Sequence, residues 1–371
     1  MQILILGGYG HFGGRISRTL ANDPDLEIIV AGRSADAAAR FIEHSGTAAR
    51  SMRPLSLDLD ASDLATQLRR HAPGLVIHTA GPFQHRDYRV AEAALAIGAH
   101  YIDLSDGRDF VTGIHSALNA KARQARCRVI SGASSVPGLS AAVIAAYRPR
   151  FRHLHSIESG ILPGNQTPRG LATTRAILGY VGRPYRILLD GCWQTVHGWQ
   201  SLRKVPIPGL HGNWYAHCEV PDLSVLPQRY PELRHCDFRA GLELRRMHFG
   251  LWLASWLVRA GLIRNLASWA ERLISISDHW MKAGTDVGGM YLDMSGDAED
   301  GTPLRLRWII RAAAGDGPQI PCTAAIVLAR KLARGELHGS GATPCLDLFS
   351  LADFMEALEG FAIETDVFSM N

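Results

Sequence analysis

Short apolar runs alternate with amphipathic segments through the first 150 residues. The apolar runs are rich in Ile, Val and Leu, which is typical of strands that are covered on both faces. The expected strands are residues 2–6, 27–31, 52–57, 75–79, 100–104 and 127–131. The expected helices are residues 15–21, 36–44, 61–71, 88–97 and 109–124. This alternation predicts a doubly wound parallel sheet in an α/β fold, whose strand-to-helix loops meet at one ligand-binding edge.

The pattern changes after residue 150. Turns rich in Gly and Pro separate irregular strands, and strands are expected at 190–200, 289–295 and 304–312. They indicate a second α+β domain with a mixed, mostly antiparallel sheet. An Ala- and Leu-rich helix at 323–334 and the tail after it are expected to return to the first domain. The predicted division is 1–148 plus 317–371 for the first domain and 149–316 for the second.

One segment, 243–281, holds four of the eight tryptophans. It is interpreted as amphipathic helix, broken at Gly261. Its uncharged stretch, 247–258, is shorter than the roughly 18 residues that a membrane span needs. Burial against the second domain or at a subunit interface explains such a helix. The alternatives are a lid over an apolar substrate and a peripheral contact with a membrane or lipid surface.

Composition narrows the class of protein. The chain has 371 residues, 47% hydrophobic and 20% charged, which suits one large or two globular domains and excludes a disordered or fibrous chain. A net charge of +4 without a dense basic run argues against nucleic acid as a partner. Six scattered cysteines and no visible signal peptide favour the cytoplasm. The cysteine and histidine spacings match no metal motif, so no metal is expected.

A glycine-rich motif follows the first strand directly. It fits the pattern G-x-G-x-x-G and reads Gly8-Tyr9-Gly10-His11-Phe12-Gly13. The first glycine permits the tight turn, the second lets the backbone approach a pyrophosphate, and the third lets the helix pack closely on the sheet. The helix start then offers free N–H groups to the phosphates. The motif predicts a Rossmann dinucleotide-binding domain; the alternative is a glycine-rich turn that binds nothing.

The end of the second strand indicates which dinucleotide is bound. An NAD site has Asp or Glu at this point, whereas this chain has Arg33 and Ser34. Arginine would pair with a 2′-phosphate and serine could donate a hydrogen bond to it, so NADP(H) is predicted over NAD(H). The alternative is an exposed arginine. Asp58 is placed to reach the adenine amino group or to cap a helix.

Two later loops supply the remaining candidate residues. The backbone of Ala80, Gly81, Pro82 and Phe83 is expected beneath the nicotinamide ribose, with the Phe83 ring near the nicotinamide. Hydride transfer belongs to the cofactor, and the protein supplies a proton. Tyr101 and Asp106 are the predicted catalytic residues, and His78 and His85 are further candidates. Each has a structural alternative: Tyr101 buries its ring, Asp106 caps the next helix, and His78 is a core histidine.

Several of these motifs together resemble the saccharopine dehydrogenase-like family of NADP-binding oxidoreductases. They are the opening glycine motif, Ala31-Gly32-Arg33, Ala80-Gly81-Pro82-Phe83, His100-Tyr101-Ile102-Asp103-Leu104-Ser105 and Gly317-Pro318-Gln319-Ile320-Pro321. The resemblance covers about 1–140 and 315–345. It implies a Rossmann domain completed by C-terminal helices and an inserted α+β domain that often dimerises. It also implies NADP(H)-dependent hydride transfer to or from a C=N bond, with the cofactor held by residues 8–13, 33–34 and 80–83.

Three functions follow as hypotheses. The first is an NADP(H)-dependent oxidoreductase acting on a C=N bond of a small amino-bearing metabolite. The second is an enoyl or acyl reductase whose apolar substrate is covered by segment 243–281, since other family members are similar to enoyl reductases. The third is a non-catalytic NADP-binding regulatory protein. The expected partners are a small-molecule substrate and a second copy in a homodimer.

Overall fold

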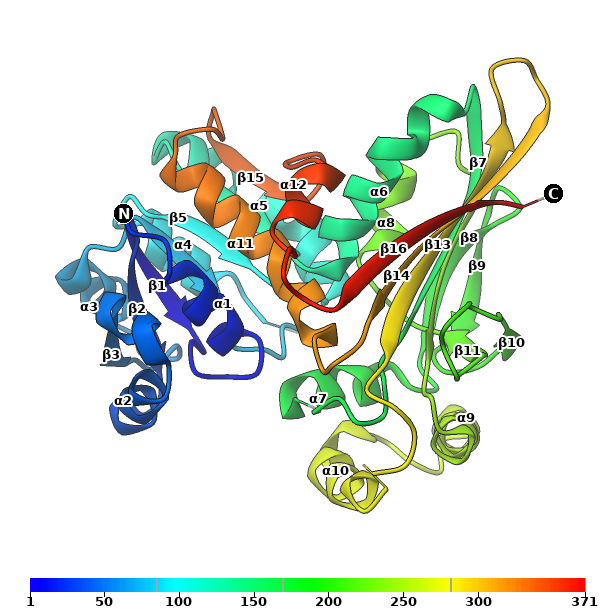
Figure 1. Cartoon of the computed structure of the whole chain (residues 1–371), viewed down its shortest axis with the longest axis horizontal. Coiled ribbons are helices and arrows are strands. Elements are labelled where there is room, and N and C mark those ends of the chain that lie inside the picture. Colours follow the sequence, from blue (N-terminus) through cyan, green and yellow to red (C-terminus); the bar gives the residue numbers. More distant parts are fainter. Residues whose placement is uncertain (85, 169, 281, 371) are drawn as a thin grey trace. The chain divides into compact units, whose positions relative to one another are not determined.

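A computed structural model describes residues 1–84, 86–168, 170–280 and 282–370. The chain divides into two compact units (Figure 1). The first comprises Met1–Ala142 and Pro318–Glu359, and the second comprises Val143–Gly317 and Gly360–Asn371. The long segment of the second unit runs from Val143 to Gly317, where the sequence-based division had 149–316.

The first unit is built on a seven-stranded parallel sheet with the order β15-β6-β5-β4-β1-β2-β3. Its strands are β1 Gln2–Leu6, β2 Glu27–Gly32, β3 Met52–Ser56, β4 Leu75–His78, β5 His100–Asp103, β6 Arg128–Ser131 and β15 Gly341–Pro344. The order reverses where β1 lies between β2 and β4, as in a doubly wound sheet. The predicted α/β fold is confirmed. The seventh strand, β15, was not expected and pairs with β6.

Burial on both faces explains why the first six strands could be recognised. Consecutive residues such as Ile3, Leu4 and Ile5 are all fully buried, because helices cover both sides of the sheet. The helices are α1 Gly13–Leu20, α2 Ala35–Glu43, α3 Leu64–His71, α4 Arg89–Leu95, α5 Arg108–Gln124, α11 Ile320–Ala333 and α12 Leu351–Glu356. Helix α11 packs on α1, and α6 (Ser140–Tyr147) leads into the second unit. The C-terminal helices therefore complete this unit.

The second unit contains a nine-stranded mixed sheet. Its main path has the order β10-β11-β12-β7-β13-β14-β16, and β8 joins β12 and β9 at the side. The strands are β7 His153–Leu162, β8 Pro184–Leu189, β9 Cys192–His197, β10 Arg203–Lys204, β11 Trp214–His217, β12 His235–Gly241, β13 Gly288–Asp297, β14 Pro303–Ala312 and β16 Ile363–Ser369. Strands β12 and β7 are parallel, whereas the other described pairs are antiparallel. A mixed sheet was predicted and is confirmed.

Two predicted elements of this region differ from the structure. The strand expected at 190–200 is present as β9, but it covers only Cys192–His197, because Asp190 and Gly191, with positive φ values of 52° and 80°, form the turn of a hairpin between β8 and β9. The tail was assigned wholly to the first domain, but Ile363–Ser369 pairs antiparallel with β14. A side-chain contact fixes this pairing, since Asp366 lies 2.6 Å from Arg311. The local sequence around Asp366 or Arg311 does not predict that these two residues pair.

The helices of the second unit are α7 Leu171–Tyr180, α8 Asp222–Arg229, α9 Arg245–Arg259 and α10 Ala270–Asp278. The predicted helical segment is present, and it is interrupted after α9 near Gly261, whose φ is 77°. Among the described residues, no helix has the length and apolar character needed to cross a membrane.

Candidate functional site

The glycine motif forms a tight strand–turn–helix at the end of β1. The N–H groups of Gly7 and Gly8 donate to the carbonyl of Ala31 on β2, at 2.8 and 3.1 Å. A Cβ on Gly8 would lie 2.8 Å from the Ile5 carbonyl oxygen, and one on Gly13 would lie 2.2 Å from the Gly7 oxygen. Both glycines are therefore required by the packing of the turn itself.

Gly10 differs from the other two glycines of the motif because it is exposed. A Cβ there would meet only the Gly7 carbonyl, at 3.0 Å for the oxygen, and would otherwise stand above the turn. Among the described residues, none accepts a hydrogen bond from the backbone N–H of His11, Phe12 or Gly13. An open backbone beside free N–H groups at a helix start fits the pyrophosphate of a dinucleotide.

The neighbours of this turn hold it in place. Burial, and then the charge of Arg15, lower the pKa of His11, so its ring is neutral near pH 7. The Arg15 guanidinium donates to the His11 carbonyl at 2.6 Å. From α11, the thiol of Cys322 lies 3.5 Å from the carbonyl oxygen of Phe12. The C-terminal part of the unit therefore supports the loop that sequence analysis assigned to the cofactor.

Tyr9 connects the glycine turn to the end of β2. Its hydroxyl accepts a hydrogen bond from the backbone N–H of Ser34 at 3.2 Å. Its ring lies against Gly32, where a Cβ would come within 2.4 Å of a ring carbon. Tyr9 therefore positions the loop that carries Arg33. Sequence analysis named Tyr9 only as part of the motif and did not single out Gly32, because their contact joins residues 23 positions apart.

Arg33 and Ser34 present an anion-binding pair at this loop. Arg33 is exposed, and the described residues include no ion-pair or hydrogen-bond partner for its guanidinium. The Ser34 hydroxyl oxygen caps α2 by accepting the N–H of Ala37 at 3.1 Å. Its own hydrogen stays free to donate. Asp36 follows in the first turn of α2 and is the nearest carboxylate in the sequence.

Asp58 and the loop after β4 complete the predicted cofactor residues. The exposed Asp58 carboxylate accepts the backbone N–H of Asp60 at 3.0 Å, so it closes a turn and caps no helix; α3 begins only at Leu64. Thr79, directly before Ala80, ties the β4 loop to β1 by donating to the Leu6 carbonyl at 2.8 Å. Ala80, Gly81 and Pro82 are partly exposed.

Phe83 does not extend toward this edge. It is 4% exposed and packs in the core, where its ring centroid lies 4.8 Å from that of His78 and 5.5 Å from that of Phe110. In this conformation the Phe83 ring is too buried to contact a nicotinamide. A contribution of Phe83 to cofactor binding would come from its backbone.

A buried polar cluster lies at the ends of β4, β5 and β6. Asp103 and His78 are neighbours in the register of the parallel strands. The Oδ1 atom of Asp103 accepts hydrogen bonds from the backbone N–H of Ser105 and Gly132 and from the Ser131 hydroxyl, each at 2.9 Å. Burial outweighs these bonds and raises the pKa of Asp103 to about 6.

The two predicted catalytic residues stand differently. Tyr101 is fully buried, and its hydroxyl lies 3.0 Å from Nδ1 of His78. Burial, and then the charge of Asp103, raise the pKa of Tyr101, while burial lowers the pKa of His78 to about 4. Asp106 is partly exposed and accepts a hydrogen bond from Gln84 at 3.1 Å. Burial raises its pKa. His85 lies outside the described residues.

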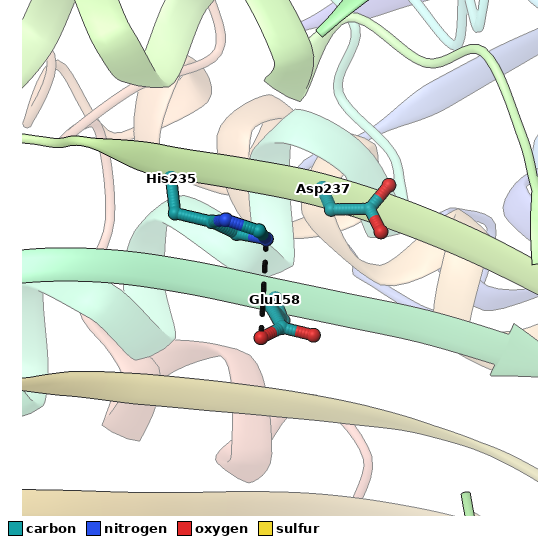
Figure 2. A group of neighbouring side chains, drawn as sticks. All are labelled: Glu158, His235 and Asp237. Atoms are coloured by element: carbon teal, nitrogen blue, oxygen red, sulfur yellow. Dashed lines mark ion pairs between the residues drawn. The ribbon is translucent and has the colours of Figure 1, made fainter. Parts of the chain in front are cut away.

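A second group of titratable side chains lies on the nine-stranded sheet (Figure 2). Glu158 on β7 and His235 and Asp237 on β12 have ligand-type atoms within 4.8 Å of one another. The dashed line joins Nε2 of His235 and Oε1 of Glu158, which lie 3.9 Å apart. Such a set is a candidate for a divalent cation, so the partners of its carboxylates decide the question.

Those carboxylates already have basic partners. Asp237 accepts from Nε of Arg239 at 2.7 Å and lies 3.0 Å from Nδ1 of His217. Burial alone would raise the pKa of Asp237, but the bond to His217 and the charge of Arg239 lower it. Glu158 pairs with Arg203. A cation would have to compete with two arginines, so this group fits an ion-pair network better than a metal centre.

The turn, the open helix start and the basic residue after β2 define a dinucleotide-binding α/β domain at the carboxyl edge of the parallel sheet. Comparison with protein families identifies it further. Residues 3–130 match the family described as the saccharopine dehydrogenase NADP binding domain. The resemblance drawn from the sequence motifs is confirmed for these residues. No curated protein matches the sequence.

Solved structures extend the likeness to the rest of the chain. Saccharopine dehydrogenase (L-Glu forming) from Saccharomyces cerevisiae matches with a TM-score of 0.67 at 14% identity, covering 99% of each chain. DAP dehydrogenase of C. glutamicum, in complex with DAP, matches with a TM-score of 0.47 at 12% identity, covering 96% of this chain and 98% of that one. At such identity the match to the yeast protein is a likeness of fold.

Proposed function

We propose that the protein is an NADP(H)-dependent oxidoreductase that transfers hydride to or from a C=N bond of a small amino-bearing metabolite. The observation that carries the cofactor choice is the loop after β2, where exposed Arg33 and the free hydroxyl hydrogen of Ser34 replace the usual acid. The saccharopine-type NADP binding domain supports the class of reaction.

The residues divide the binding of NADP(H) between them. Arg33 and Ser34 would hold the 2′-phosphate, and the amides of residues 11–13 would receive the pyrophosphate. Tyr9 holds the glycine turn and the loop after β2 together through its hydrogen bond to Ser34. When bound, the cofactor supplies the hydride, and the remaining task of the protein is to place the substrate and move a proton.

Asp106 is the better placed of the two proposed catalytic residues. It is partly exposed and follows β5 at the carboxyl edge, and burial raises its pKa, which favours the protonated form needed by a donor. Tyr101 is fully buried against His78, so we propose a positioning role for it within the buried cluster. Both assignments place the substrate at the carboxyl edge of the parallel sheet, where β5 ends.

Titration with both cofactors tests the role of Arg33. Arg33→Ala is expected to weaken NADPH binding roughly tenfold to a hundredfold, the range of a charge-assisted hydrogen bond, with little effect on NADH. Arg40→Ala, which removes an exposed arginine from the following helix α2, serves as the control and should bind NADPH like the parent. An unchanged NADPH/NADH preference in Arg33→Ala would refute the assignment.

A substrate panel tests the reaction. Oxidation of NADPH should occur with imines formed from keto acids and amines, and Asp106→Asn should lower kcat roughly 10²- to 10⁴-fold while NADPH binding is retained. Turnover of enoyl thioesters alone would replace the C=N proposal with the enoyl reductase. Tight NADPH binding without turnover on either panel would instead indicate a regulatory protein.

A further inference from the structure

Helix α9 leaves several of its large apolar side chains exposed. Its buried residues are His248, Ser255 and Val258. Its exposed face carries Leu253, Trp256 and Leu257, which lie three and four residues apart and therefore on one side of the helix. A helix that packs only on its own domain buries the larger apolar side chains instead.

Exposed apolar side chains continue through the connection and α10. Helix α10 buries Ala270 and Ser277 and exposes Ile276, with Trp269 just before it and Trp280 just after it. Together these side chains form what we call the exposed apolar surface, which consists of Leu253, Trp256, Leu257, Leu262, Trp269, Ile276 and Trp280. It contains seven of the eleven large hydrophobic side chains that are exposed in the described part of the chain.

One contact shows that the two helices belong to a single surface. The guanidinium carbon of Arg246, at the start of α9, lies 4.3 Å from the ring centroid of Trp280, beyond the end of α10. Figure 1 places both helices at the same end of the nine-stranded sheet. Leu262, in the connection between them, is 74% exposed, the highest fraction among these side chains.

Basic residues accompany the exposed apolar surface. Residues 245–282 contain six basic and two acidic side chains, an excess of four that equals the formal net charge of the whole chain. Besides Arg246 on Trp280, two further arginines stack on exposed tryptophans: Arg259 lies 5.1 Å from the Trp256 ring, and Arg272 lies 5.6 Å from that of Trp269. One of the two acids, Glu271, is paired with Arg175 at 2.7 Å.

We propose that this surface docks the protein on an anionic lipid bilayer. Tryptophan prefers the membrane–water interface, and arginines beside it can pair with lipid phosphates. Helices that lie in the interface have this combination of apolar and basic faces, and no described helix could span the bilayer. A symmetric contact with a second copy is disfavoured, because it would bring two basic surfaces together.

Co-sedimentation of the full-length protein with vesicles tests the proposal. Binding is expected to phosphatidylcholine vesicles that contain phosphatidylserine, to be weak without it, and to fall as salt rises. Arg246→Glu and Arg259→Glu should each weaken binding about fivefold or more, the value of one basic contact at an anionic surface. Trp256→Ser and Leu262→Ser should weaken it by removing apolar contacts.

Trp193→Ser is the matched control. Trp193 is likewise exposed and stacked with an arginine, 6.0 Å from Arg186, but it lies on β9, outside these helices. The Trp193→Ser variant should therefore bind vesicles like the parent protein. Circular dichroism checks that each variant is folded. If the Trp256→Ser variant is unfolded, the test rests on Leu262→Ser, because Leu262 is highly exposed and its replacement should not disturb folding.

Three results would overturn the proposal. The first is no binding to phosphatidylserine vesicles. The second is binding that Leu262→Ser and Arg259→Glu leave unchanged. The third is a change in molar mass of these variants by light scattering without vesicles, which would assign the surface to a second copy.

Discussion

At the scale of single residues, the carboxyl edge of the parallel sheet holds polar groups away from water. Asp103 is fully buried, and three donors converge on one of its oxygens. Tyr101 and His78 continue this cluster through a 3.0 Å contact. Buried polar clusters of this kind fix side-chain positions, because each unsatisfied member would cost free energy. The cluster therefore holds the ends of β4, β5 and β6 in fixed positions and supports the loops that follow them.

Asp103 should make stability depend on pH. Burial raises its pKa from 3.8 to about 6, so between these values the native protein keeps a proton that the unfolded chain has released. This contribution to stability is complete at low pH and is lost as pH rises through 6. Relative to Asp103→Asn, the free energy of unfolding of the parent should fall by about 2 kcal/mol between pH 4 and pH 7.

Urea unfolding of both proteins across this pH range measures the difference. Asp109→Asn, which changes an exposed carboxylate on α5, is the control and should show no such pH-dependent difference from the parent. A difference between the parent and the Asp103→Asn variant that stays constant with pH would contradict the raised pKa.

At the scale of elements, one strand–turn–helix unit determines how the cofactor can be held. The turn leaves β1 through Gly7, whose φ is 76°, and enters α1 at Gly13. The approach of α1 to the turn is so close that a side chain at position 13 has no room. Because α1 starts so close to the turn, its free N–H groups converge on a single site above the glycine turn.

Gly13→Ala should therefore damage both folding and binding. The new Cβ would lie 2.2 Å from the Gly7 oxygen and 2.6 Å from the Thr79 hydroxyl oxygen, and the backbone oxygen cannot rotate away. We expect a loss of about 1–3 kcal/mol in the free energy of unfolding, together with weaker NADPH binding. Gly179→Ala in α7 is the control, since a Cβ there has no heavy atom within 4 Å. Equal effects of the two changes would refute the packing argument.

At the scale of the whole molecule, the chain separates a parallel sheet from a mixed one. The first unit is assembled from two pieces of sequence, and α11 and β15 return to it after the second unit. The last strand, β16, then crosses back to pair with β14. The same chain thus leaves and re-enters each unit, and the exposed apolar surface belongs to the second unit alone.

Local sequence patterns were enough to predict the parallel sheet, the glycine turn and the helical segment. Strands buried on both faces are apolar at consecutive positions, and G-x-G-x-x-G meets a local steric need, so both are visible over a few residues. The edge strands β15 and β16 and the hairpin turn at Asp190 carried no comparable local signal.

Which side chains meet depended on the folded chain. Folding buried Tyr101 and the ring of Phe83, set Tyr9 against Gly32, and compensated Glu158 and Asp237 with arginines. It also left Leu253, Trp256 and Leu257 of α9 exposed, which amphipathic spacing alone cannot tell. Periodicity fixes which residues share a face, whereas burial depends on what distant parts of the chain bring against that face.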